Sequence, residues 1–179
     1  MDFERRTMQL YCLFENQFAE PEEVRGFWFD MAQHESRHYG ALALVKGLLD
    51  SAPTRTLPAA LGLERERVEH LSKLLARLER EARAGVPLKR AFEMALEVEG
   101  SEVEDLVLDL LSALKGEAER ERAVQLLIHD LGDLSYMIEK YTRDRKLLAR
   151  VDSLIENEVA RLRDQTRGLP QKGAEGRKS

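Results

Sequence analysis

The chain has 179 residues, of which 43% are hydrophobic, 34% charged and 6% aromatic, and this composition is typical of an amphipathic, all-helical protein. The net charge of −5 gives no basic footprint for nucleic-acid binding. The single cysteine, Cys12, excludes an intrachain disulfide and a four-cysteine iron or zinc site. No signal-peptide core follows Met1 and no apolar run is long enough to span a membrane, so we expect a cytoplasmic protein.

The first half of the chain predicts three helices. Apolar residues spaced three and four apart indicate helices over 2–19 and 21–50, which form a first hairpin over 2–50. A linker rich in proline and small residues follows, and a further helix is predicted over 59–84. Gly85-Val86-Pro87 ends that helix.

The second half predicts a second hairpin and an extension. Helices are expected over 87–115 and from 117 to about 143, so the hairpin spans 87–143. A helical pattern continues over 145–167, either as one long helix or as a fifth helix after a break near Thr142. We therefore predict a single domain over 1–167 and a disordered tail over 168–179.

Carboxylates interrupt the apolar stripes at one fixed interval. Glu4 and Glu35 are 31 residues apart, Glu99 and Asp130 are 31 residues apart, and the second pair is the first shifted by 95 residues. This offset indicates an internal repeat of a helical hairpin. Two such hairpins make a four-helix bundle, with residues 59–84 as the crossover helix.

The hairpin geometry brings the first carboxylates together. If the turn of the first hairpin centres near residue 21, residues 4 and 38 lie at the same height on antiparallel helices. Glu4 can therefore meet Glu35 and His38, which share a helix face because they are three residues apart. Buried carboxylates with an imidazole suit a pair of iron or manganese ions. The candidate metal ligands are Glu4, Glu35, His38, Glu99, Asp130 and Asp133, the last standing where His38 stands in the first hairpin.

Two segments resemble the ferritin-like superfamily, specifically its rubrerythrin-like branch. Glu4 is followed seven residues later by Tyr11, as in that family's first helix, and the segment 22–38 is similar to its second helix. The resemblance implies a ferritin-like four-helix bundle with two iron ions per chain, or manganese or zinc in their place. It implies Glu4, Glu35, His38 and Glu99 as ligands, and an oxidoreductase acting on peroxide or dioxygen with an unknown electron donor. The family's fourth-helix Glu-x-x-His reads Asp130-Leu131-Gly132-Asp133 here.

Two alternatives remain open at this point. The Asp130 and Asp133 replacements fit a bundle whose site has degenerated, now a non-enzymatic interaction or structural module. His34-Glu35-x-x-His38 also matches a zinc hydrolase motif. Three features count against a zinc hydrolase. Arg37 places a charge inside the motif, position 44 is leucine where the extended motif has its third histidine, and no strand is predicted. His34 is then either a partly exposed neighbour of the site or a residue that supports one of its ligands.

The apolar pattern also predicts a homodimer. The second helix continues past His38 through an apolar segment that the short first helix does not reach, and the extension at 145–167 has an apolar stripe of its own. Unless these two surfaces cover each other within one chain, a second copy buries them.

Overall fold

The computed structural model describes residues 2–51, 65–101 and 117–168, and every element in these ranges is helical. The all-α class is therefore confirmed for the described chain. None of the described helices combines the length and the apolar character that crossing a bilayer requires. The helices are α1 (Asp2–Gln17), α2 (Glu22–Ser51), α3 (Arg65–Arg83), α4 (Leu88–Glu99), α6 (Glu117–Tyr141) and α7 (Arg145–Gly168).

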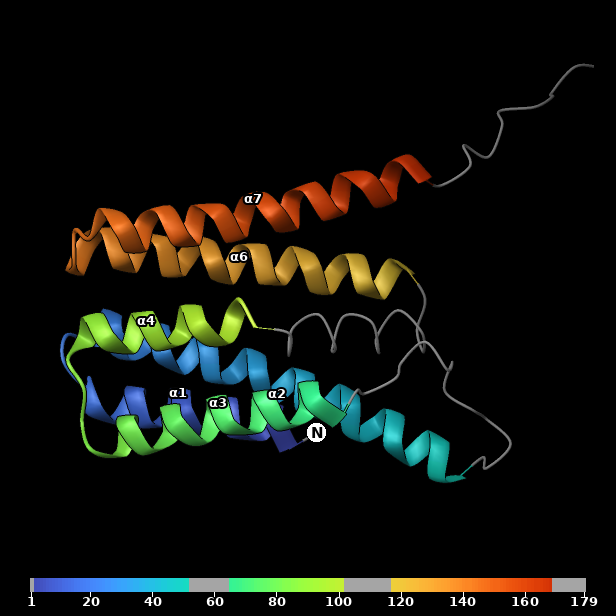
Figure 1. Cartoon of the computed structure of the whole chain (residues 1–179), viewed down its shortest axis with the longest axis horizontal. Helices are drawn as coiled ribbons and strands as arrows, with labels where there is room; N and C mark the ends of the chain where they lie inside the picture. Colours follow the sequence, from blue (N-terminus) through green and yellow to red (C-terminus); the bar gives the residue numbers. More distant parts are fainter. Residues whose placement is uncertain (1, 52–64, 102–116, 169–179) are drawn as a thin grey trace, which may run out of the picture.

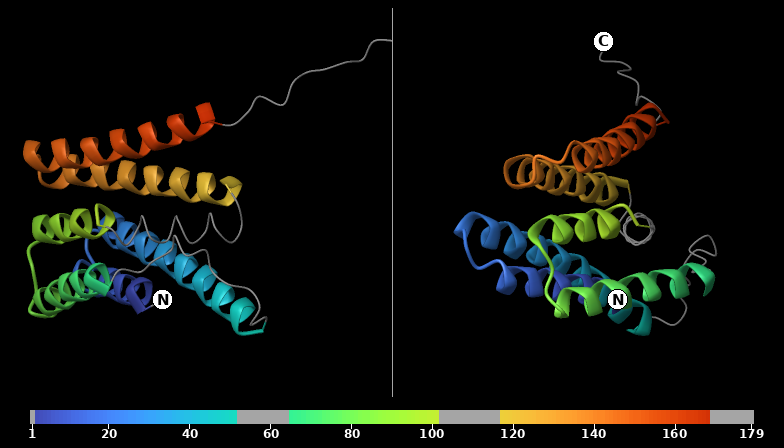
Figure 2. Two further views of the ribbon diagram at one scale, coloured as in Figure 1. Left: turned by 45° about the vertical axis from the view of Figure 1, so that its right-hand side comes forward. Right: turned by 60° about the vertical axis from the view of Figure 1, so that its left-hand side comes forward.

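The helices form two groups joined by α4. Figures 1 and 2 show α1 and α2 running antiparallel, with α3 alongside α1, while α6 and α7 lie side by side as a separate antiparallel pair. α4 contacts α3, α6 and α7, so it lies between the two groups. The turn between α3 and α4 contains Gly85, whose φ of +84° is a backbone conformation that glycine adopts without strain.

The fourth helix ends earlier than the sequence predicted. The expected helix over 87–115 stops at Glu99, and its continuation beyond residue 101 lies outside the described residues. The Gly100 N–H donates to the Leu96 carbonyl, and the Ser101 N–H donates to the Val98 carbonyl at 2.9 Å, a three-residue bond that tightens and closes the last turn. Glycine after the final turn stops the helix because its helix propensity is low.

The break near Thr142 is real, so α7 is a separate helix. Arg143 has a φ of 53°, outside the helical range. Asp144 then caps α7, because its Oδ1 accepts hydrogen bonds from the N–H groups of Lys146 at 2.8 Å and Leu147 at 3.1 Å. The observed helix matches the predicted extension over 145–167 to within one residue, whereas the predicted tail beyond Gly168 lies outside the described chain.

The core is apolar and rich in aromatic rings. Trp28 is fully buried and stacks on Tyr11 at 5.9 Å and on Phe92 at 5.4 Å, measured between ring centroids, which ties α1, α2 and α4 together. Leu147 and Val151 of α7 are buried, and α7 packs mainly on α6. The α7 stripe is thus covered within one chain, by α6 rather than by α2. On α2 beyond His38, Leu42 is buried and Leu44 is exposed.

Candidate metal centre

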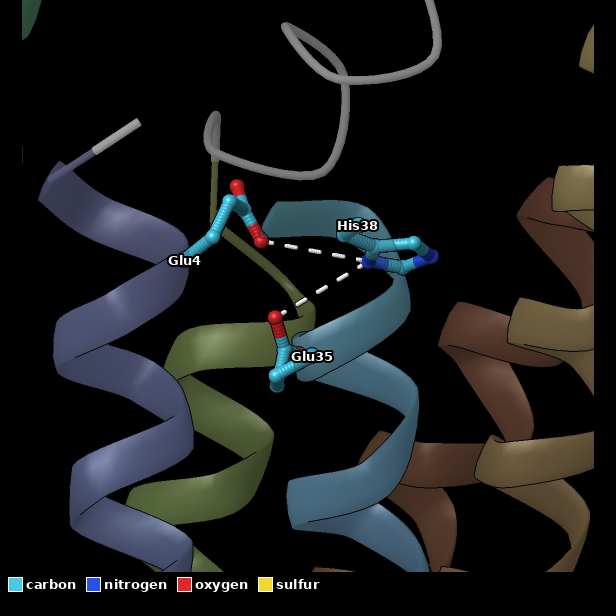
Figure 3. Close-up of side chains that lie close together, drawn as sticks. All are labelled: Glu4, Glu35 and His38. Carbon is cyan, nitrogen blue, oxygen red and sulfur yellow. Dashed lines mark ion pairs between the residues drawn. The ribbon is translucent and has the colours of Figure 1, made fainter. Parts of the chain in front are cut away.

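Three side chains from α1 and α2 meet near the N-terminus of the chain. Figure 3 shows Glu4 of α1 pointing toward Glu35 and His38 of α2. His38 Nδ1 lies 3.9 Å from Glu4 Oε2 and 3.8 Å from Glu35 Oε2. One potential ligand atom from each residue lies within 4.8 Å of the other two, a spacing that could hold a metal ion. The proximity expected from the hairpin geometry is therefore observed.

These carboxylates are buried together, which is electrostatically unfavourable without a cation. Glu4 is 1% and Glu35 3% exposed. Burial raises the pKa of Glu4 well above its usual range, the neighbouring Glu35 carboxyl raises it further, and the imidazole of His38 opposes both. Two carboxylates in one buried site cannot both be charged at low cost unless a positive charge joins them.

Glu99 of α4 is a further buried carboxylate that interacts electrostatically with this group. It is 7% exposed, and the Tyr11 hydroxyl donates a hydrogen bond of 2.5 Å to its Oε1. Burial raises the pKa of Glu99 to about 7. The Tyr11 hydrogen bond opposes this rise, while the charges of Asp130 and Glu4 add to it. Glu99 therefore interacts electrostatically both with the α1–α2 group and with α6.

Asp130 of α6 pairs with an unexpected partner. It is 6% exposed, and its Oδ1 lies 2.7 Å from Nδ1 of His34, whose side chain is 20% exposed. Contact with Asp130 raises the pKa of His34, against the effect of burial. The expectation that His34 is a partly exposed neighbour of the site is met, but the sequence did not identify Asp130 as its partner.

Asp133 does not join the buried residues. Its side chain is 58% exposed, and Oδ2 lies 3.4 Å from Nδ1 of His129, which is itself exposed. The side chains at 130 and 133 lie about 60° apart around α6, close enough to share a face as Glu35 and His38 do on α2, so the rotation of α6 about its axis decides which of them is buried. The structure turns Asp130 inward and leaves Asp133 at the surface.

One buried carboxylate was missed in the sequence. Glu158 of α7 is 8% exposed, and its Oε1 accepts a hydrogen bond of 2.9 Å from Arg161. Together with Glu99 and Leu131 it lines a pocket of about 400 Å³. The signal was present, because Glu158 interrupts the α7 stripe at helical spacing, three residues after Ile155 and four before Leu162.

The zinc hydrolase motif does not form one site in the described chain. Glu35 and His38 share a group with Glu4, whereas His34 is directed to Asp130 on a different helix. The two histidines that the motif requires on one ion are thus engaged with different carboxylates.

Comparison of the chain with models of protein families, with curated proteins and with solved structures finds no match.

Proposed function

We propose that this chain is a metal-binding protein of ferritin-like architecture, with a di-iron carboxylate centre that has oxidoreductase activity toward peroxide or dioxygen. The observation that supports this most strongly is the convergence of Glu4, Glu35 and His38 from two helices into one buried group. In this proposal α1 with α2 and α4 with α6 are the two repeated hairpins. Glu99 and Asp130 supply the carboxylates of the second hairpin.

The donor set fits iron. Carboxylate oxygens and an imidazole nitrogen are the ligands that ferrous and manganous ions accept. Glu4 Oε2 and His38 Nδ1 are buried and make no hydrogen bond to any described residue. A divalent cation between them would satisfy both atoms and would remove the repulsion between Glu4 and Glu35, whereas an apo site leaves that cost uncompensated.

The protein's own groups would position the centre and control access to it. Bound iron would supply the electrons for reduction of peroxide or dioxygen by cycling between its ferrous and ferric states. Tyr11 holds Glu99 in one orientation through its hydrogen bond. The pocket beside Glu99, at about 400 Å³, has room for a small oxidant, and the buried Trp28 stacks on both Tyr11 and Phe92.

A second candidate is the degenerate bundle that serves as an interaction or structural module. The exposure of Asp133 favours it, because α6 then buries only one of its two candidate ligands, Asp130. The two candidates differ in whether iron binds and whether bound iron is oxidised.

Iron binding to matched variants tests the proposal. Protein stripped with a chelator is titrated anaerobically with Fe²⁺, and bound iron and Tm are measured for wild type, Glu4→Gln and Glu15→Gln. Glu15 is the control because it lies on the same helix, is partly exposed and makes a long ion pair with Arg25, at 3.9 Å. At a hundredfold excess over Kd, binding adds about 2.7 kcal/mol of stability. In a domain of this size that raises Tm by about 5–11 °C.

We expect wild type and Glu15→Gln to bind two irons and to show this rise, and Glu4→Gln to lose at least one iron. Hydrogen peroxide should then convert the bound iron to its ferric form, seen as new near-ultraviolet absorption. Iron that binds without being oxidised would favour the structural module. Wild-type protein that binds no iron would exclude the metal centre.

A further inference from the structure

The contact between His34 and Asp130 has an unusual geometry for an ion pair. His34 Nδ1 and Asp130 Oδ1 are 2.7 Å apart, yet neither atom has a hydrogen-bond partner among the described residues. The contact is thus close but not aligned as a hydrogen bond. Asp130 is only 6% exposed, so few water molecules can reach its carboxylate to accept the role of a hydrogen-bond partner.

Such a geometry is what two ligands of one metal ion show. Nitrogen and oxygen ligands bind a first-row metal at about 2.1 Å, so two ligands at right angles lie about 3.0 Å apart. Their lone pairs point at the ion and not at each other. A close, misaligned contact between an imidazole and a carboxylate therefore fits a shared cation better than a direct hydrogen bond.

There is space beside this pair. His34 and Asp130 line a pocket of about 180 Å³ between α2 and α6, whose other walls include Met31 and Met137. The exposed side chains of Asp133 and Tyr136 also line it, so the pocket reaches the surface. A metal ion with water ligands needs only part of this volume, and the opening provides an entry path.

We propose that His34 supplies the imidazole that α6 lacks, so that His34 and Asp130 form a second metal position across α2 and α6. This inference rests on the proposed function, in which Glu4, Glu35 and His38 hold the first metal. One α2 segment then contributes to both positions, with His34 directed to one and Glu35 and His38 to the other. Glu99 is buried and interacts electrostatically with Glu4 and His38 of the first group and with Asp130 of the second, so its carboxylate would be available to either position.

Two other imidazoles serve as comparisons. His129 lies on α6, 3.7 Å from Asp130 Oδ1, but its side chain is 69% exposed and is closer to Asp133. His70 is exposed on α3. His129→Gln therefore tests whether the neighbouring imidazole holds the ion, and His70→Gln controls for loss of any surface histidine.

Metal stoichiometry in these variants tests the assignment. Chelator-treated protein is dialysed against Co²⁺ and, separately, Zn²⁺, and bound metal per chain is counted after far-UV circular dichroism has shown that each variant keeps its helicity. We expect two ions in wild type, His70→Gln and His129→Gln, and one ion in His34→Gln. His38→Gln should also bind one ion, and the double variant of His34 and His38 should bind none.

A second variant keeps a ligand at position 34 and reads out the contact directly. His34→Cys in a Cys12→Ser background places the chain's only thiol there. With Co²⁺ bound, it should regain the second ion and show a thiolate-to-cobalt charge-transfer band in the near ultraviolet, which the Cys12→Ser parent lacks. Because this signal arises only from a sulfur–cobalt bond, a structural role of His34 would not produce it.

The outcomes separate this inference from the proposed function. Two ions retained in His34→Gln, or a loss seen in His129→Gln instead, would overturn the role of His34 and leave the metal centre intact. If the wild type binds one ion, and His38→Gln loses it while His34→Gln keeps it, the role of His34 is likewise overturned and the first metal position stands. No ion in the wild type would overturn both. One ion in His34→Gln with the cobalt band in His34→Cys would establish the second position.

Discussion

Replacing Glu99 with glutamine should make the metal-free protein more stable above neutral pH. Glu99 is a buried acid whose pKa is raised from 4.5 to about 7, chiefly by burial, with the charges of Asp130 and Glu4 adding to the rise and the Tyr11 hydrogen bond opposing it. The folded state therefore holds this proton more tightly than the unfolded state. Glutamine has almost the same shape and can still accept the hydrogen bond from Tyr11, but it has no proton to lose.

The size and sign follow from proton linkage. A pKa shift from 4.5 to about 7 corresponds to about 3 kcal/mol. Because the folded pKa is the higher one, this stability is fully present below pH 4.5 and is lost as the pH rises through about 7. For a chain of this length the loss lowers Tm by about 6–12 °C. The Glu99→Gln variant should not show this loss of stability, because glutamine does not titrate.

Urea denaturation in the presence of a chelator measures the effect. The difference in unfolding free energy between Glu99→Gln and wild type should be near zero at about pH 4.5 and about 3 kcal/mol in favour of the variant at about pH 8. His34 and Glu4 also have raised pKa values, but both proteins contain them, so the difference reports the titration of Glu99 together with its electrostatic coupling to Glu4. Added Fe²⁺ should reverse the order, because only the wild type keeps the full ligand set.

Glu97→Gln is the matched control, two residues earlier on the same helix. Burial raises the pKa of Glu97, but hydrogen bonds from Arg77 and Arg90 outweigh this effect and lower the pKa. Removing the Glu97 carboxylate should therefore not stabilise the protein at high pH. If Glu99→Gln gains no unfolding free energy over wild type at about pH 8, or if its advantage grows toward acid pH, the pKa of Glu99 is not raised in the folded state.

Two further predictions concern packing and assembly. Gly100→Ala should lower the unfolding free energy by about 1–3 kcal/mol, since a Cβ there would lie 3.0 Å from the Leu96 carbonyl oxygen and 3.2 Å from the Leu154 side chain. Gly132→Ala, where a Cβ would meet nothing within 4 Å, should raise it by about 0.5–1 kcal/mol. The two variants should therefore shift Tm in opposite directions. The homodimer predicted from the apolar segment of α2 should sediment at twice 20.5 kDa. It should dissociate in Leu44→Glu, since Leu44 is 55% exposed on α2, and a wild-type mass of 20.5 kDa would contradict the dimer.

The first hairpin was largely predictable because its information is local. Apolar spacing set the helices, and a turn near residue 21 fixed which positions of α1 and α2 share a height, so the meeting of Glu4 with Glu35 and His38 followed from counting residues. Burial of Glu99 and Asp130 likewise followed from their stripe positions.

The second hairpin was harder because rotation about the helix axis and long-range pairing decide it. The repeat places Asp133 at the position of His38, but the side chain of Asp133 is exposed, and the imidazole nearest to Asp130 comes from α2. α4 ends at Glu99, with Gly100 as its C-cap, although the apolar spacing of the sequence continues past this glycine, so the periodicity alone did not locate the end of the helix.

The aromatic cluster gives the protein an optical probe of its own centre. Trp28 is the only tryptophan in the chain, and its indole stacks on Tyr11, whose hydroxyl holds Glu99. Because the indole is fully buried, its emission should be blue-shifted in the folded state and should shift to the red when the core opens. A change in the charge of Glu99 acts on the ring next to the fluorophore, so intrinsic fluorescence can follow protonation of the centre without any added label.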